Sequence, residues 1–141
     1  MRPVLVLLAL LGGPALAQAQ PAPASALAAG FSLPSGRLQC MYDDSSGPAS
    51  IRCDVLNPTF RVARPASCPL DYGDSVTLNV TGRPLLGCHG DTVVDPQRPV
   101  LAYQRFWQRA GLTCQSSTAG VRCINIDGHG FELSRARYRL F

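Results

Sequence analysis

Hydrophobic and polar residues alternate in short stretches along the chain, and turns containing glycine or proline separate these stretches. In residues 75–81, for example, Val76, Leu78 and Val80 fall on one side of an extended chain. Comparable stretches lie at residues 37–42, 50–54, 85–88, 92–94, 111–115, 121–126 and 131–133. Turn signals that recur about every 8 to 12 residues are typical of all-β domains. We therefore predict a small antiparallel β-sandwich or barrel built from hairpins.

Residues 100–108 are the one stretch whose spacing also fits a helix. Ala102 and Phe106, and likewise Tyr103 and Trp107, are four positions apart and would share one face of a helix. A run this short fits a turn equally well, so the sequence leaves a short helix or a turn open here.

The first residues have the pattern of a secretory signal peptide. Arg2 precedes an uninterrupted apolar run at residues 4–11, and Ala15 and Ala17 fit the small-residue cleavage rule. The run is far shorter than the roughly 20 residues that cross a bilayer, so no transmembrane segment is expected in the mature chain. We predict a signal peptide at residues 1–17, a disordered linker of alanine, proline and glutamine at residues 18–30, and one domain at residues 31–141. The mature protein is then expected in the periplasm or outside the cell.

The charged residues exclude several functions. All 13 basic side chains are arginine, so the chain has no lysine for a Schiff base, a phosphate-binding loop or general-base catalysis. The formal charge of +4 falls by one unit when Arg2 leaves with the signal peptide. Because so small a charge creates a weak field, and because the protein is exported, nucleic acid is not an expected partner.

The six cysteines form three pairs that are local in the sequence. Two of these pairs lie in similar surroundings, since Leu-Gln-Cys40 and Ile-Arg-Cys53 match Leu-Thr-Cys114 and Val-Arg-Cys123. Each pair fits a hairpin with one cysteine on each arm, where opposed Cα atoms lie within reach of a disulfide. The competing zinc site requires closely spaced cysteines, and these are absent. Among the 15 possible connectivities we predict the disulfides Cys40 to Cys53, Cys68 to Cys88 and Cys114 to Cys123.

The last hairpin allows a prediction of register. A two-residue Asp-Gly loop would pair Cys123 with Glu132, whereas a three-residue loop over residues 127–129 would pair Cys123 with Leu133. We favour the second register, because it places Val121, Cys123, Phe131 and Leu133 together on the buried face and leaves the histidine of the loop at a turn.

Two histidines and two aspartates are candidates for chemistry. His89 and Asp91, and likewise Asp127 and His129, are two positions apart and would point to one side of a strand. Together they could form a metal site or a His-Asp dyad, which would make the protein a small hydrolase or a metal-dependent enzyme. We favour ordinary turn roles, because neither HExxH nor GxSxG is present. No cofactor is expected.

Three arginines near the C-terminus are candidates for binding. If residues 134–140 are extended, Arg135, Arg137 and Arg139 form one row suited to phosphate, carboxylate or acidic polysaccharide. If Ser134 instead caps a turn, the three side chains point in different directions. A charged edge strand that prevents aggregation needs no ligand, so a purely structural role is also open.

Several motifs together resemble a known family. Cys68-Pro-Leu-Asp-Tyr-Gly-Asp74, Cys88-His-Gly-Asp-Thr92 and Gly128-His-Gly-Phe-Glu-Leu-Ser-Arg135 resemble a family of uncharacterised secreted bacterial domains. The resemblance implies an exported bacterial module with a shared six-cysteine framework, and it transfers no catalytic role to any residue. We therefore expect a non-catalytic domain that binds a partner or associates with the envelope. The expected partner is an envelope protein or an anionic polymer.

Overall fold

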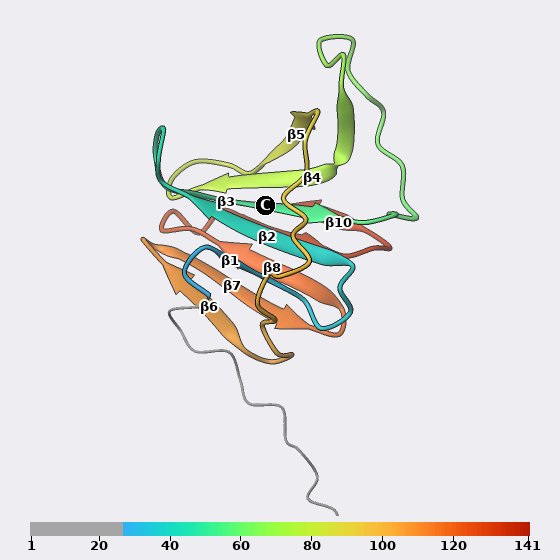
Figure 1. Cartoon of the computed structure of the whole chain (residues 1–141). Helices are drawn as coiled ribbons and strands as arrows, with labels where there is room; N and C mark the ends of the chain where they lie inside the picture. The colour runs from blue at the N-terminus through green and yellow to red at the C-terminus, as the bar shows by residue number, and fades with distance from the viewer. Residues whose placement is uncertain (1–26) are drawn as a thin grey trace, which may run out of the picture.

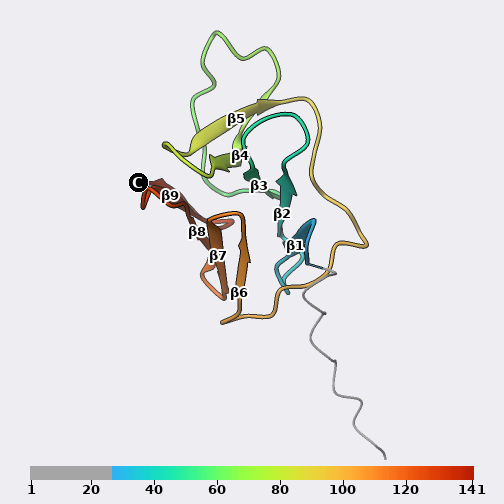
Figure 2. The ribbon, with the colours of Figure 1, turned by 90° about the vertical axis from the view of Figure 1, so that its left-hand side faces the viewer.

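The computed structural model describes residues 27–141, which form two antiparallel sheets of five strands each packed as a sandwich (Figures 1 and 2). The first sheet contains β1 (Gly30–Ser32), β2 (Leu38–Asp43), β3 (Ser50–Val55), β4 (Asp71–Asn79) and β5 (Leu85–His89), in that order. The second contains β6 (Phe106–Arg109), β7 (Leu112–Ser117), β8 (Gly120–Ile124), β9 (Gly130–Leu133) and β10 (Tyr138–Leu140). The predicted all-β sandwich is therefore confirmed.

Residues 1–26 lie outside the described part of the chain, and they hold the predicted signal peptide and most of the predicted linker. The remaining linker residues contact the domain: the Leu27 carbonyl accepts a hydrogen bond of 2.7 Å from Trp107 Nε1, and the Ala28 carbonyl accepts one of 2.7 Å from Arg109. Nothing in residues 27–141 forms a helix that could span a bilayer.

The inward-facing residues of both sheets form one core. Alternate positions are buried in several strands, as in Leu112–Ser117, where every second side chain faces inward, whereas the edge strands β5 and β10 have no fully buried residue. The largest side chains with essentially no exposed surface are Phe31, Phe131, Ile51, Leu78, Leu112 and Leu133. Strands that the alternation predicted are thus held by burial of their apolar face.

The two sheets are built on the same plan. Each is a meander whose second and third strands carry directly opposed cysteines, with Cα atoms 4.0 Å apart in both disulfides. A buried aromatic residue lies opposite the first cysteine in each sheet: Phe31 faces Cys40, and Trp107 faces Cys114. The matching sequence around the cysteine pairs therefore corresponds to matching positions in the two sheets.

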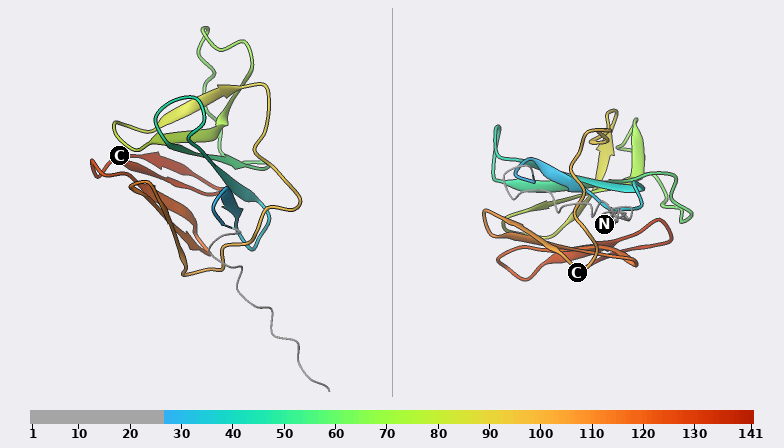
Figure 3. Two further views of the ribbon diagram at one scale, coloured as in Figure 1. Left: turned by 60° about the vertical axis from the view of Figure 1, so that its left-hand side comes forward. Right: turned by 60° about the horizontal axis from the view of Figure 1, so that its bottom comes forward.

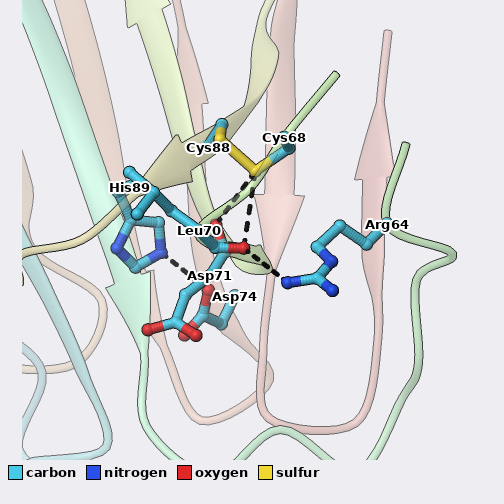
Figure 4. Close-up of a disulfide and its surroundings, with 7 residues drawn as sticks. All are labelled: Arg64, Cys68, Leu70, Asp71, Asp74, Cys88 and His89. Carbon is cyan, nitrogen blue, oxygen red and sulfur yellow. Dashed lines mark hydrogen bonds and ion pairs between the residues drawn. A yellow bond between two sulfur atoms is a disulfide. The ribbon is translucent and has the colours of Figure 1, made fainter. Parts of the chain in front are cut away.

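The third disulfide ties a long connection to the first sheet. It joins Cys68, in the segment between β3 and β4, to Cys88 on β5, with Cα atoms 5.7 Å apart (Figure 4). Cys68 is buried. All three disulfides join the pairs that local spacing predicts.

The predicted register of the last hairpin is wrong. Cys123 pairs with Phe131 rather than Glu132 or Leu133, and the last paired residues are Ile124 and Gly130, so residues 125–129 form the connection. The cause is Asn125, whose Oδ1 accepts hydrogen bonds of 3.1 Å from the backbone N–H groups of Asp127 and His129 and so shapes this connection. The buried face nevertheless contains the predicted residues, because a shift of two positions keeps each side chain on its own face.

The helical alternative for residues 100–108 is also wrong, and a turn occurs there instead. The Leu101 N–H donates to the Ser32 carbonyl at 2.9 Å, so the chain first runs beside β1. It then turns at Gln104, where φ is 66°, and enters β6. The connection from β5 reaches this point by crossing the outer side of the first sheet (Figures 2 and 3).

Candidate functional site

Three turns meet at one end of the sandwich and enclose a cleft. Because successive turns of a meander alternate between the two ends, the β1–β2, β7–β8 and β9–β10 turns share this end. The cleft between them has a volume of about 570 Å³, and we call it the basic cleft. Its lining consists of Leu33, Ser35, Arg37, Leu38, Tyr103, Ser117, Thr118, Ala119, Gly120, Ser134, Arg135, Ala136 and Arg137.

A serine-capped turn determines where the C-terminal arginines point. Ser134 Oγ accepts hydrogen bonds from the N–H groups of Ala136 and Arg137 at 3.3 and 3.2 Å, and it folds the chain between β9 and β10. Arg135 Nε donates to the Asn57 carbonyl at 3.0 Å, while Arg139 lies on β10. The three arginines therefore do not form one row, and the alternative in which Ser134 caps a turn is the one found.

The basic cleft contains positive charge without a matching carboxylate. Arg37, Arg135 and Arg137 line it, and its lining includes no Asp or Glu. Within residues 27–141 the guanidinium groups of Arg37 and Arg137 have no hydrogen-bond or ion-pair partner. Acidic turn residues lie at the opposite end of the sandwich, where Asp44 is 3.5 Å from Arg109 and Asp127 accepts from the Gly82 N–H. The cleft end is therefore attractive to anions.

A second, smaller hollow continues from the basic cleft onto the outer face of the second sheet. This side groove has a volume of about 220 Å³ and includes Arg122 and Glu132. It shares Ser117, Ala119, Gly120, Ser134 and Arg137 with the cleft. The two hollows therefore meet around Arg137.

Arginines outnumber the single carboxylate of the side groove. Glu132 lies on β9 between Arg122 and Arg139, with N–O distances of 3.6 and 2.9 Å. The hydrogen bond from Arg139 and the charges of all neighbouring arginines, including Arg137, lower the pKa of Glu132. One carboxylate thus faces three guanidinium groups, and the groove keeps an excess of positive charge.

His89, by contrast, is occupied by contacts within the protein (Figure 4). Its Nε2 lies 2.8 Å from Asp74 Oδ1, and its Nδ1 lies 2.6 Å from the Asp91 carbonyl. Burial opposes the charged ring, but the hydrogen bonds to Asp74 and to the Asp91 backbone outweigh it and raise the pKa of His89. Two acceptors favour an imidazolium with both nitrogens protonated, which has no lone pair for a metal or a proton.

The four histidine and aspartate candidates are not brought together. Asp91 accepts from Arg52 Nη1 at 2.7 Å beside His89, whereas Asp127 accepts from the Gly82 N–H beyond the other end of β5. His129 lies in the β8–β9 loop with Asp127. Across residues 27–141, no three histidine, cysteine, aspartate or glutamate side chains are placed to hold a metal ion. The geometry supports the turn roles of these residues.

A comparison with known protein families identifies the family of this chain. A model described as a family of unknown function (DUF6636) matches residues 7–141. The chain belongs to this family. No curated protein and no solved structure matches it. The function of this DUF6636 protein is therefore inferred from its fold and from the basic cleft.

The sequence singled out two of the cleft arginines but missed the other lining groups. Arg37 follows a Ser-Gly turn, and Tyr103 lies in the stretch that left a helix or turn open. Neither has a local signal for binding, because only the packing of the two sheets brings their turns beside Arg137.

Proposed function

We propose that this protein is an exported, non-catalytic module that binds an anionic ligand in the basic cleft. The observation that carries the proposal is the presence of three arginines and no carboxylate in one hollow. Export is supported by three disulfides, which form and persist in oxidising compartments such as the periplasm and the extracellular space.

The chemistry of the lining suits anion binding. A guanidinium group presents a planar fork of N–H donors that matches a carboxylate or phosphate. Leu33 and Leu38 are buried beneath the cleft, and the side chains of Ser35 and Thr118 offer hydroxyl groups beside the arginines. An apolar base lowers the local dielectric constant, so ion pairs formed there are stronger than on an open surface.

Binding to immobilised polygalacturonate at low ionic strength tests the proposal. We expect the double variant Arg37→Ala, Arg137→Ala to bind at least about tenfold more weakly, which corresponds to about 1.4 kcal/mol. The matched control is Arg61→Ala, Arg83→Ala, which removes the same net charge from exposed positions outside the cleft. Equal weakening by both pairs would show that net charge alone attracts the polymer and would refute a site in the cleft.

A further inference from the structure

The arginines of the two hollows form a continuous track rather than a single point of charge. Arg37 and Arg135 lie in the basic cleft, Arg137 lines both hollows, and Arg122 lines the side groove. Arg139 follows on β10, paired in register with Glu132. The track therefore begins between the sheets and continues over the rim onto the outer face of the second sheet.

The strand geometry sets the spacing of the track. Glu132 on β9 pairs with Arg122 on β8 and with Arg139 on β10. Neighbouring strands lie about 4.8 Å apart, so the backbones of the two arginines are about 10 Å apart with the carboxylate between them. Arg137 precedes Arg139 by two positions, which is about 7 Å along an extended chain. A ligand with one anionic group meets only one part of this track.

We propose that the ligand is a linear carboxylated polysaccharide that occupies both the basic cleft and the side groove, with Arg137 at their junction. This inference rests on the proposed function. Successive carboxylates along one chain would pair with arginines in both hollows. Each additional pair then forms within an existing complex, which raises affinity steeply with chain length.

The lining favours a polysaccharide over other polyanions. Among the described residues that line either hollow, Tyr103 is the one aromatic side chain, whereas single-stranded nucleic acid is bound by several stacking aromatics. Arginine clusters also bind acidic peptide motifs, so the groups beside the arginines have to distinguish a sugar from a peptide. Here the arginines lie beside Ser35 and Thr118, whose hydroxyl groups can exchange hydrogen bonds with sugar hydroxyls, whereas those of Ser117 and Ser134 already donate to the Gly120 and Arg137 carbonyls.

Titration with oligogalacturonates of increasing length tests this inference by calorimetry at low ionic strength. For the unmodified protein, we expect affinity to rise by at least about tenfold once the oligomer is long enough to reach the side groove. Arg122→Ala should abolish this gain while leaving the affinity for the shortest binding oligomer within about twofold. Arg37→Ala should weaken binding at every length, and Arg83→Ala, outside both hollows, should change neither.

The possible results separate the inference from the proposed function. If Arg37→Ala weakens binding but Arg122→Ala has no effect at any length, the ligand is confined to the cleft and the inference is overturned while the proposed function stands. If neither substitution has an effect, both are overturned. Equal or tighter binding of oligoglutamates of matched charge would show that an acidic peptide is the better ligand and would also overturn the inference.

Discussion

Arg52 offers a sharp test of how the outer face of the first sheet is stabilised. Its Nε and Nη2 donate to the two carboxylate oxygens of Asp54 at 2.9 and 3.1 Å. The Asp54 side chain is 6% exposed, so Arg52→Ala leaves a buried carboxylate without its cation. Losing one partner of a buried pair costs about 3–5 kcal/mol; since Thr92 and Val93 still donate to Asp54, we expect about 3 kcal/mol.

The second sheet supplies a matched control at the corresponding position. Arg122 also precedes the second cysteine of a strand-joining disulfide, but its side chain is 47% exposed and its distance to Glu132 is 3.6 Å. Exposed pairs contribute about 0–1 kcal/mol, so Arg122→Ala should have a small effect. Urea denaturation should show a midpoint lower by about 1–3 M for Arg52→Ala at unchanged slope. Equal losses for the two variants would refute the assignment of stability to burial of the Arg52 pair.

Two further predictions concern His89 and Asn125. Because the pKa of His89 is raised in the folded protein, its contribution to stability should be complete below its ordinary pKa of about 6.5 and disappear as pH rises through the folded-state value. Free energies of unfolding measured against pH should show this loss. A profile for His89→Gln that runs parallel to that of the unmodified protein would contradict the prediction. Asn125→Ala removes two hydrogen bonds accepted by Oδ1 and two donated by Nδ2 to Asn79 and Gly82, so we expect about 2 kcal/mol of destabilisation. Hydrogen exchange at the Asp127 amide should accelerate, and unchanged protection there would show that Asn125 does not shape the loop.

The hairpins and their disulfides could be predicted because the information is local. Alternation of apolar residues identifies a strand, and the cysteines of two disulfides lie directly opposed on adjacent strands of a hairpin. Cys68 instead lies in the connection before β4, so only its short separation from Cys88 in the sequence indicated that pair. The register of the last hairpin could not be obtained this way. Asn125 bonds to Asn79 and Gly82, which come from the other sheet, so the size of its loop depends on how the two sheets pack.

The candidate site was less predictable than the fold. A row of alternating arginines at residues 135–139 looks the same in sequence whether the chain is extended or turned, and Ser134 decides between them through its hydrogen bonds. The i, i+2 histidine and aspartate pairs are equally ambiguous, because sequence spacing does not say which end of a strand each pair occupies. The hydrogen bonds of Ser134 answer the first question, and the topology of the first and second sheets answers the second.

The amino-acid sequence by itself determined the secondary-structure class, the cysteine pairs and the identity of the buried faces, because these depend on alternation along a strand and on short separations in the sequence. Only the tertiary structure decided that Arg37, Tyr103, Thr118 and Arg137 meet in one cleft. The physical reason is that the cleft is made by turns from different sheets. Their proximity follows from burying two apolar faces against each other, and no turn carries a local record of the turn that it will face.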